Sequence, residues 1–454
     1  MKKTTAFDMT NGPFTKKIIM FALPLVLTGI LQLLYNTADT AIVGRFAGDE
    51  ALAAVGATGS LVSLILNTFM GLSTGSGVVS ANYIGAGNHE RVHRCTHTAM
   101  SLSLICGVIV GIIGFFFAKP MLRLMNSPEN VIELSTTYLK IFFLGAPGSL
   151  VYNFGAALVR STGDTKKPLY ILTLSGLVNV ILNLILVIPF KMGVSGVAIA
   201  TIVSQYISAV MIVVHLTKMD NSSRLEIRKM RIYGHEFAKI LKIGLPAGFQ
   251  NSLFSVSNVI IQSTVNSFGS VAMAGIAAGS NFDSYIYTFT NAVAQTTMTF
   301  TSQNRGAGKP ENIMKIYRRC LLIATVAGVG LSMVGLIFRE PLVSIFSSEP
   351  DVIAVGMQRL ELIMPFYVFC SLLDVASFQL RGMGKSFEPM LISLFGTCGF
   401  RLFWVFVILP MNHTLINLYR AYPVSWIITF LAQSVLLMGI TAKYKKEQKI
   451  KEQN

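Results

Sequence analysis

Twelve apolar runs, each close to the length needed to cross a membrane, dominate this sequence. A transmembrane helix needs roughly 20 mostly apolar residues, because it must span a hydrocarbon core about 30 Å thick. Only 13% of the 454 residues are charged, whereas soluble domains average about 25%. The runs lie approximately at residues 17–44, 50–80, 95–118, 131–157, 168–189, 194–216, 240–267, 272–302, 318–338, 353–380, 389–410 and 416–441. No stretch of soluble-domain size remains, so we expect an all-α membrane protein of twelve transmembrane helices.

The net charge of +16 could indicate a nucleic-acid partner, but the distribution of the basic residues points elsewhere. Lysine and arginine are concentrated in every second loop and at the end of the chain, whereas the loops between hold few. The concentrated residues are Lys16, Lys17, Arg91, Arg94, Arg160, Lys166, Lys167, Lys218, Arg224, Arg228, Lys229, Arg231, Lys239, Arg305, Lys309, Arg318, Arg319, Arg381, Lys385 and the lysines from Lys443 to Lys451. Cytoplasmic loops of membrane proteins carry such an excess. We therefore expect a multi-pass monomer of the cell membrane with both termini in the cytoplasm, whose partner is the lipid bilayer and not nucleic acid.

The two halves of the chain match each other at an offset of 221 to 222 residues. The matched segments are Phe21 to Pro24 with Ile243 to Pro246, Phe46 with Phe268, Gly85-Ala86-Gly87 with Gly306-Ala307-Gly308, and Arg160, Gly163 and Pro168 with Arg381, Gly384 and Pro389. Four matches in order at nearly one offset indicate an internal duplication. Each half holds six spans, so both copies insert with the same orientation, as a parallel repeat.

The duplication predicts two six-helix bundles around a central cleft. Rocking of one bundle against the other would open that cleft to each side of the membrane in turn. Pro147 and Pro365 fall inside the fourth and tenth spans, where each should kink its helix. The linker is either an amphipathic surface helix or a plain solvated segment. The expected parts are an N-lobe at 1–217, a cytoplasmic linker at 218–239, a C-lobe at 240–443 and a basic cytoplasmic tail at 444–454.

Asp39 is the most informative single residue, because it lies near the far end of the first apolar run. Between Ile18 and Gly44 the only other ionisable group is the phenol of Tyr35. A carboxylate within a span costs roughly 2.5–3.5 kcal/mol on insertion scales, and such residues usually face a cavity and handle a proton or a cation. We therefore expect Asp39 to bind a proton, a metal cation or a cationic substrate.

Two polar residues of the fifth and sixth spans, Asn183 and Thr201, are expected at the same depth as Asp39, and Asn179 is expected to complete the shell. Asn179 and Asn183 are four residues apart and so share a helix face. Counted from the outer ends of the spans at 1.5 Å per residue, Asp39, Asn183 and Thr201 lie roughly 10 Å below the outer surface. Such an oxygen-rich shell suits Na⁺, or a proton on Asp39 that is hydrogen-bonded to the others. Alternatively, the two amides and the hydroxyl only satisfy one another between helices.

The first span and the segment after it resemble the first-helix signature of the MATE family, the multidrug and toxic compound extrusion transporters. The resemblance rests on LQLLYNTADTAIVG at residues 31–44, ALAAVG at 51–56, RSTGD at 160–164, the Gly-Ala-Gly loops and the six-plus-six repeat. It implies that the chain is not an enzyme but a secondary-active antiporter. Such proteins export organic, often cationic, small compounds in exchange for H⁺ or Na⁺ and need no cofactor besides that coupling ion.

The resemblance also implies roles for the polar residues of the N-lobe. The family's first-helix acid is an essential coupling residue, to which Asp39 corresponds. One prokaryotic branch has a cation site of an Asn-x-x-x-Asp pair on the fifth helix and a Thr on the sixth, to which Asn179, Asn183 and Thr201 correspond. Position 183 is Asn where the family pattern often has Asp, so one charge is missing and proton coupling through Asp39 is favoured over a firmly held Na⁺. A second branch has a Glu on the seventh helix, but residues 250–255 contain no acid.

The C-lobe has ionisable residues of its own within the predicted spans. Asp374 lies in the tenth span, Arg401 in the middle of the eleventh, and Glu361 nearer the outer end of the tenth. Buried charges usually pair with one another, so an ion pair of Arg401 with Asp374 or with Glu361 is expected. Alternatively, Asp374 binds a cationic substrate or a second proton. The residue that matches Asp39 in the repeat is Ile261, so we expect coupling to be asymmetric.

The central cleft is expected to be apolar and adaptable, because the chain has 21 methionines and 30 phenylalanines. Flexible thioethers and aromatic rings can repack around varied ligands. Polar side chains on the cleft-facing halves would supply further contacts to small organic substrates. The candidates are Gln32, Tyr35, Asn36, Gln250, Asn258, Tyr285, Asn291 and Gln295.

Three other functions are weighed against export. A flippase for a lipid-linked saccharide precursor, as in the wider superfamily, would line its cleft with several basic residues for pyrophosphate, but this chain offers mainly Arg401 deep in the membrane. A membrane enzyme would need paired acids, a metal cluster, a nucleophile with its base or a phosphate-binding loop, and the sequence shows none of these. A channel is possible in principle, but the duplication into two lobes favours a transporter that works by alternating access.

Overall fold

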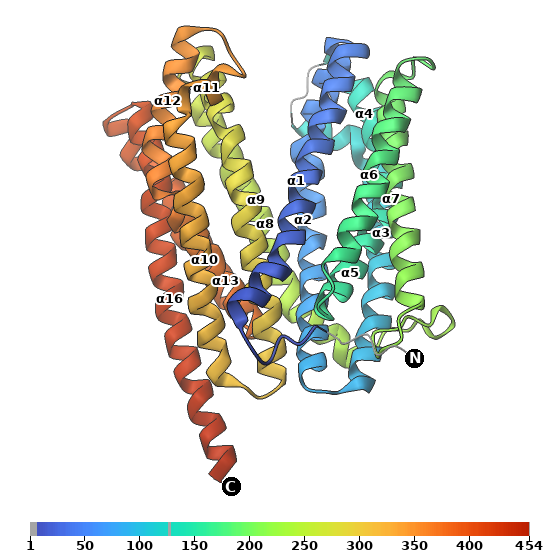
Figure 1. The fold of residues 1–454 in the computed structure, drawn as a ribbon. Coiled ribbons are helices and arrows are strands. Elements are labelled where there is room, and N and C mark those ends of the chain that lie inside the picture. Colours follow the sequence, from blue (N-terminus) through green and yellow to red (C-terminus); the bar gives the residue numbers. More distant parts are fainter. Residues whose placement is uncertain (1–6, 126–128, 454) are drawn as a thin grey trace. The chain divides into compact units, whose positions relative to one another are not determined.

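The structure, a computed structural model, describes residues 7–125 and 129–453, and over these residues it consists of helices and connecting segments without strands (Figure 1). The all-α fold predicted from the apolar runs is therefore confirmed. Short 3₁₀ turns lie at η1 (Ile227–Lys229), η2 (Met364–Phe366) and η5 (Leu409–Met411), and π-helical turns at η3 (Leu394–Gly399) and η4 (Trp404–Ile408). The α-helices are α1 (Phe14–Phe46), α2 (Asp49–Gly85), α3 (His89–Leu124), α4 (Glu129–Leu144), α5 (Ala146–Ser161), α6 (Lys166–Val187), α7 (Gly193–Thr217), α8 (Gly234–Asn266), α9 (Ser270–Gly306), α10 (Pro310–Ile337), α11 (Arg339–Ser344), α12 (Pro350–Ile363), α13 (Tyr367–Gly382), α14 (Phe387–Ser393), α15 (Phe400–Phe403) and α16 (Leu415–Gln453).

Nine helices in the described part of the chain are long and apolar enough to cross a membrane, or ten if the bent pair α4 and α5 forms one span. Among these, α12 to α13 and α14 to η5 each form one span, at Pro350–Gly382 and Phe387–Met411. α8 and α9 have the length, with 33 and 37 residues. They are less apolar because they carry side chains such as Gln250, Asn258 and Asp283. With these two helices, each of the twelve predicted runs corresponds to one helix or one interrupted helix.

Two spans are interrupted where the sequence places a proline near the middle. α4 and α5 meet at Gly145 with a bend of 46°, and Pro147 lies in the first turn of α5. Pro365 occupies η2, between α12 and α13. Proline removes a backbone donor and clashes with the preceding turn, so the α-helical hydrogen bonding cannot continue through it. The interruptions predicted at both prolines are present.

The duplication is visible in the backbone as well as in the sequence. Glycines at matched positions of the two halves have matching positive φ angles, a conformation that glycine adopts without strain. They lie at the start of the second long helix of each half and in the loops after the second and fourth spans. The pairs are Gly48 (89°) with Gly269 (91°), Gly87 (65°) with Gly308 (67°), and Gly163 (101°) with Gly384 (75°).

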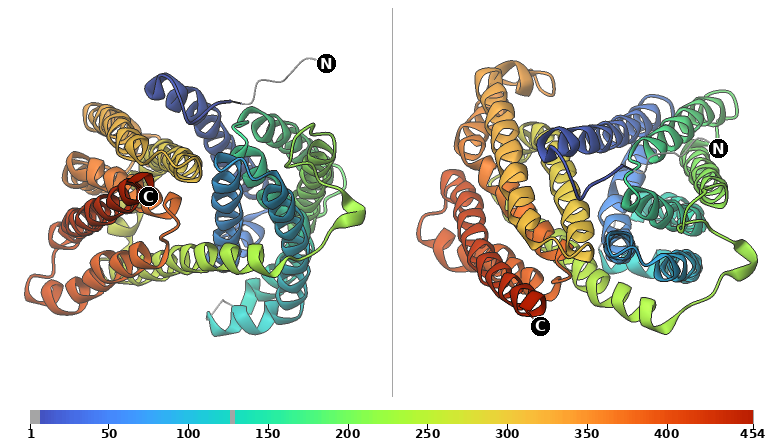
Figure 2. Two further views of the ribbon diagram at one scale, coloured as in Figure 1. Left: turned by 90° about the horizontal axis from the view of Figure 1, so that it is seen from below. Right: turned by 60° about the horizontal axis from the view of Figure 1, so that its bottom comes forward.

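The helices form two compact units (Figure 2). Unit 1 consists mainly of Leu27–Gly248, and unit 2 of Met9–Val26 and the chain from Phe249 onward. In unit 1, α5 packs against α2, α3 and α7, and α6 packs against α7. In unit 2, α9 packs against α10, α12 and α13, and α16 packs against α13. Each unit thus buries its own apolar core.

The linker differs from one of its two predicted forms. Residues 218–233 contain only the turn η1, and Tyr233-Gly234-His235-Glu236 lead directly into α8. The amphipathic-helix interpretation is therefore wrong, because the segment is too irregular to form successive helical turns. The linker is nevertheless not fully solvated, since Ser223 and Leu225 are only 1% and 2% exposed.

Candidate functional site

The carboxylate of Asp39 lies between α1 and α6 within unit 1. Nδ2 of Asn183 donates a hydrogen bond of 2.5 Å to Oδ1 of Asp39, and it lies 3.4 Å from Oδ1 of Asn179. Asn183 is fully buried and Asn179 is 5% exposed, whereas Asp39 is partly buried. The structure thus brings together the acid and both amides of the predicted shell.

Close packing of α1 on α6 explains how these residues meet. Tyr35 lies one helical turn before Asp39, and its hydroxyl donates a hydrogen bond of 3.1 Å to the carbonyl oxygen of Thr173. The phenol ring lies directly against Gly176, where a β-carbon would overlap the ring atoms. Glycine therefore permits the approach of the two helices. One turn further along α1 and about two turns further along α6, Asp39 meets Asn183.

The walls around the acid are apolar and contain no compensating cation. A buried cluster that includes Ile42, Val43 and Val187 packs beside it. No Lys, Arg or His of the described residues forms an ion pair with Asp39. Over the described residues, the Asp39 carboxylate thus has one amide, that of Asn183, as its hydrogen-bond partner and no ion pair with a basic residue.

Tyr138 of α4 is a site residue that the sequence analysis missed. Its phenol is 9% exposed, belongs to the same buried cluster and lies within electrostatic reach of the Asp39 carboxylate. The available sequence signal was weak, because one tyrosine in an apolar run is usually an ordinary packing residue. Tyr138 is thus a buried tyrosine of α4 near the site, with no hydrogen bond to the acid or the amides among the described residues.

The orientation of Asn183 leaves one acceptor unused. While its Nδ2 points to Asp39, its Oδ1 is buried and has no hydrogen-bond partner in the described structure. Unpaired buried oxygens are rare in folded proteins and costly, so each calls for an explanation. An acceptor next to an acid is one that a proton-bearing carboxyl or a cation can satisfy.

Thr201 is the predicted member of the shell that the structure does not join to the others. Its hydroxyl donates a hydrogen bond of 2.9 Å to the carbonyl oxygen of Val197, on its own helix α7. No hydrogen bond to Asp39, Asn179 or Asn183 is present in the described residues. Counting depth along a helix fixes height but not the direction of a side chain, which explains the difference.

Unit 2 contains a second polar cluster, between α8, α9, α13 and α14. Asp374 lies within electrostatic reach of Arg381 and of Tyr287, and its Oδ2 is buried without a hydrogen-bond partner in the described structure. The guanidinium of Arg381 donates a hydrogen bond of 2.8 Å to Oε1 of Gln250, whose Nε2 donates to Oγ of Ser393 at 2.9 Å. In this unit a basic residue, Arg381, thus lies about two turns from the acid on the same helix α13.

Arg401 forms neither of the predicted ion pairs. Its Nε donates a hydrogen bond of 3.1 Å to Oγ of Ser425, and its guanidinium lies over the ring of Tyr422, 4.4 Å from the centroid. Arginine can replace a carboxylate partner by stacking on aromatic faces. The prediction of an Arg401 pair with Asp374 or Glu361 is therefore wrong.

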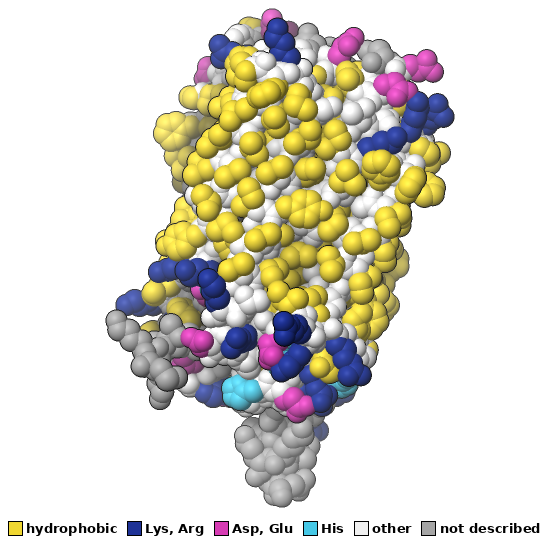
Figure 3. All heavy atoms as spheres, turned by 90° about the vertical axis from the view of Figure 1, so that its right-hand side faces the viewer, with side chains coloured by type: hydrophobic (Ala, Val, Ile, Leu, Met, Phe, Trp, Pro, Cys, Tyr) yellow, Lys and Arg dark blue, Asp and Glu magenta, His cyan; other side chains and the backbone are white. Residues whose placement is uncertain are grey.

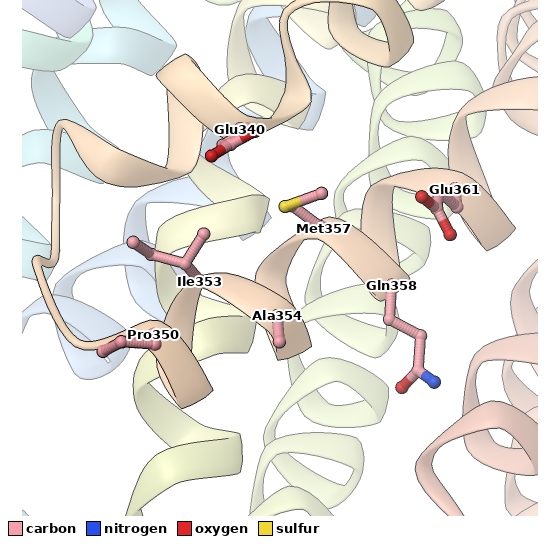
Figure 4. A pocket seen from close by; sticks show the side chains of 7 residues that line it. All are labelled: Glu340, Pro350, Ile353, Ala354, Met357, Gln358 and Glu361. Atoms are coloured by element: carbon pink, nitrogen blue, oxygen red, sulfur yellow. The ribbon is translucent and has the colours of Figure 1, made fainter.

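Glu361 pairs instead with Arg339, at 2.9 Å from Nε to Oε1. It lines a pocket of about 530 Å³ formed by α11 and α12, together with Glu340 and Met357 (Figure 4). Both side chains of the pair are exposed, 39% for Arg339 and 51% for Glu361. Glu361 therefore pairs with Arg339 at an exposed position and is joined to neither Asp374 nor Arg401 in the described structure.

The buried ion pair of unit 2 joins two residues that the sequence analysis did not single out. Arg359 of α12 donates two hydrogen bonds to the carboxylate of Asp283 of α9, at 2.5 and 3.3 Å. The two side chains are 7% and 19% exposed, and the hydroxyl of Tyr367 donates to the backbone carbonyl of Asp283 at 3.1 Å. One acid and one arginine in separate membrane-length segments were the signal that could have revealed this pair.

The candidate cleft residues fall into two groups. Four of them are exposed and free to meet a ligand: Gln32, Asn36, Asn258 and Tyr285. The side chains of the other four are engaged in hydrogen bonds. Tyr35 and Gln250 make the bonds described above. Asn291 and Gln295 bond to each other along α9, where Nε2 of Gln295 donates to Oδ1 of Asn291 at 2.7 Å. Contacts with substrate remain a prediction for all eight.

Comparison with known proteins agrees with the two-fold construction of the chain. The family model MatE matches it twice, at residues 24–185 and 246–407. A probable multidrug resistance protein of Bacillus subtilis, YoeA, is 26% identical over 92% of each chain. A protein of Shewanella oneidensis named FAD transporter is 28% identical over 76% of this chain and 77% of its own. The solved structure of a MOP superfamily transporter from Pyrococcus furiosus, 21% identical, superposes on 98% of this chain and all of the other with a TM-score of 0.92.

Proposed function

Because this chain belongs to the MatE family, whose members are membrane transporters and not enzymes, we propose that it exports small organic compounds in exchange for protons. We propose that the compounds are cationic or amphipathic, because the lone carboxylate of Asp39 suits exchange with a cation; a relative in Bacillus subtilis is named probable multidrug resistance protein. Alternating access of a central cleft would carry them across the cell membrane. We further propose that the protein acts as a monomer with both termini in the cytoplasm.

The observation that carries this proposal is the lone carboxylate of Asp39 beside Asn183. Isolated charge is costly within a membrane, so a proton that neutralises Asp39 changes the energy of the site strongly. The ionised carboxylate accepts a hydrogen bond from Nδ2 of Asn183. The protonated carboxyl would instead donate its hydrogen to Oδ1 of Asn183, after a half-turn of the amide. One amide thus serves both states, which suits a proton-exchange site.

Sodium is the alternative coupling ion, and its oxygen ligands would be the carboxylate of Asp39 and Oδ1 of Asn183 and of Asn179. Only the first of these carries charge, and over the described residues no group of three or more His, Cys, Asp or Glu side chains could hold a metal ion. A single carboxylate neutralises one proton completely, whereas Na⁺ needs several well-placed oxygens as well. The charge of this site therefore favours the proton.

The test uses purified protein in proteoliposomes loaded with a fluorescent organic cation such as ethidium. A pH gradient and a Na⁺ gradient are imposed separately, and dye movement is followed for the native chain and for Asp39→Asn. We expect movement driven by the pH gradient in the native chain and its loss in Asp39→Asn. Thr37→Ala is the matched control, because the hydroxyl of Thr37 donates a hydrogen bond to the carbonyl oxygen of Leu33 on the same helix α1. Gradient-driven movement that survives in Asp39→Asn would contradict the proton role.

An organic anion is a second candidate substrate. One relative is named FAD transporter, and a dinucleotide carries two phosphates. Arg401 is 4% exposed and pairs with no carboxylate of the described residues, so one positive charge of unit 2 has no anionic partner. The same proteoliposomes, loaded with FAD in place of dye, distinguish the candidates. Gradient-driven FAD movement without dye movement would favour the anion.

A further inference from the structure

A deep apolar groove lies on unit 1 where the linker crosses α3, α5 and α7. Its volume is about 320 Å³. The wall on the helices is formed by residues such as Leu104, Pro147 and Val210, and the wall on the linker by Leu225, Ile227 and Met230. We refer to this feature as the linker groove. Nothing in the proposed transport mechanism uses it.

The linker forms a wall because it is fastened to the start of α3. The backbone N–H of Glu226 donates a hydrogen bond of 3.1 Å to Nε2 of His97, and the backbone N–H of Tyr233 donates to the hydroxyl of Thr98 at 3.0 Å. The carboxylate of Glu226 also lies 2.7 Å from Nζ of Lys229 and 3.3 Å from Nε2 of His93. These contacts hold the linker backbone at both ends of the groove wall.

The groove has exposed apolar walls on membrane-length helices and offers almost no polar atoms. Leu104 is 48%, Val210 61% and Ile227 59% exposed, and α3 and α7 are both membrane-spanning helices. The polar tip of Tyr206, which also lines the groove, donates a hydrogen bond of 2.8 Å to the backbone carbonyl of Leu144. The complementary occupant is therefore a hydrocarbon chain.

Positive charge surrounds the linker end of the groove. Arg224, Arg228, Lys229 and Arg231 are all exposed in the segment that also supplies the apolar wall. Lys229 is paired with Glu226, but Arg224 and Arg228 pair with no carboxylate of the described residues. On the face of unit 1 shown in Figure 3, lysine and arginine side chains gather below the broad apolar band. This is the arrangement expected at the surface of a bilayer.

We propose that the linker groove binds one acyl chain of an anionic phospholipid, whose phosphate is held by Arg224 and Arg228. Juxtamembrane basic residues attract anionic headgroups, and the apolar wall of the linker supplies an adjacent place for the chain. A cationic drug is a poor occupant, because the same arginines repel it. A second copy of the protein is a poor occupant as well, since two such basic linkers would face each other. The bound lipid fastens the linker to three helices.

The test places the full-length protein in phosphatidylcholine nanodiscs that contain a trace of phosphatidylglycerol with a photoreactive acyl chain. After illumination, adducts are mapped by mass spectrometry of peptides. We expect adducts concentrated in peptides that contain residues 100–104, 206–214 and 225–230. The same photoreactive chain on phosphatidylcholine should label these peptides several-fold less, because its headgroup carries no net charge.

Two pairs of variants separate the groove from general lipid contact. Leu104→Trp fills the groove, whereas Ile112→Trp is an equally large change at a 54% exposed position further along α3. Arg224→Gln/Arg228→Gln removes the headgroup site, whereas Arg318→Gln/Arg319→Gln removes the same charge from exposed positions on α10. The first variant named in each comparison should reduce the number of adducts. For Arg224→Gln/Arg228→Gln we expect a reduction of roughly tenfold or more, because each basic residue contributes about 1 kcal/mol to the attraction of an anionic headgroup.

Several results would overturn the proposal. Adducts spread evenly over all exposed apolar helices, or equal labelling by the two phospholipids, would show only general bilayer contact. Equal loss in both members of a pair would remove the assigned residues from the site. Competition by ethidium for the labelled peptides would identify the groove as a drug site. Labelling should persist in Asp39→Asn, because lipid binding does not depend on the coupling function.

Discussion

Asp39 of unit 1 and Asp283 of unit 2 are acids placed within duplicated halves of one fold, yet their surroundings are opposite. Asp39 receives one hydrogen bond from the neutral amide of Asn183 and has apolar neighbours. Asp283 is held by two hydrogen bonds from the guanidinium of Arg359, a partner that is always charged. The first carboxylate lacks a fixed counter-ion, and the second has one.

This difference separates a structural acid from an exchangeable one. A carboxylate bound to arginine cannot take up a proton without leaving the arginine buried and unpaired. A carboxylate bound only to amides exchanges its proton with no other charge affected. The duplication therefore supplies two similar bundles, of which one holds an acid in an ion pair with arginine and the other holds an acid that has no charged partner among the described residues.

Removal of the arginine should produce the largest loss of stability. Arg359→Met leaves the Asp283 carboxylate buried without a counter-ion, which typically costs about 3–5 kcal/mol. Asp39→Asn, which removes no ion pair, should cost less than about 1 kcal/mol. Both are measured as free energies of unfolding in mild detergent, by denaturant titration.

Two controls define the meaning of that loss. Arg339→Met breaks the exposed pair with Glu361 in the same unit and should cost only about 0–1 kcal/mol. Asp283→Leu/Arg359→Met removes both charges and should regain most of the stability. If the double variant is as unstable as Arg359→Met, packing and not the unpaired charge is responsible, and the contrast between the two acids weakens.

A second carboxylate in unit 1 should convert the site from proton to sodium binding. Asn183→Asp places two acids in hydrogen-bond contact, where like charges repel and a cation relieves the repulsion. We expect the variant to gain up to about 2.7 kcal/mol of stability when Na⁺ is present at 100 times its dissociation constant. The native chain should show no such gain when Na⁺ replaces choline at equal ionic strength.

The reversed variant tests whether the two positions act together. Asp39→Asn/Asn183→Asp restores a single charge, and the Na⁺-specific gain should disappear. A gain of the same size in the native chain would mean that one carboxylate with amide oxygens already suffices for sodium, and would favour Na⁺ as the coupling ion.

The contact that positions Asp39 should be sensitive to a single methyl group. Gly176→Ala introduces a β-carbon that overlaps the Tyr35 ring, and such overpacking costs about 1–3 kcal/mol. Gly56→Ala is the matched change in unit 1, because no atom lies within 4 Å of the added carbon. In a Tyr35→Ala background the cost of Gly176→Ala should largely vanish, as measured by a double-mutant cycle. An unchanged cost would show that another neighbour of Gly176 is displaced.

The fold was predictable because its determinants are local in sequence. Apolar runs of membrane length, alternate basic loops and the prolines at 147 and 365 each act within one helix or loop. The sequence repeat further predicted that the two halves have the same helical arrangement, and the matching positive φ angles of paired glycines agree with this. The choice between helix and irregular linker was not predictable in this way, since Leu225 and Ser223 pack against the helices in spite of a polar composition.

The candidate site was predictable only in part, for a geometric reason. Helical spacing placed Asn179 and Asn183 on one helix face, and depth placed Asn183 beside Asp39. The structure joins Asn183 to Asp39 and to Asn179. Spacing could not reveal that the hydroxyl of Thr201 points to its own backbone, or that Arg401 stacks on Tyr422. Such partners depend on helix rotation and packing, which a single sequence does not specify.

The smallest expected effect tests the hydrogen bond that anchors α1 to α6. Tyr35→Phe keeps the ring against Gly176 but removes the donor to the Thr173 carbonyl. Hydrogen bonds between membrane helices contribute about 0.6 kcal/mol on average, so the free energy of unfolding should fall by about that amount. Tyr170→Phe, at a 61% exposed position on α6, should change nothing. If Tyr35→Phe lowers proton-driven transport far more than stability, the bond orients Asp39 toward Asn183; if transport is unaffected, ring packing alone positions the acid.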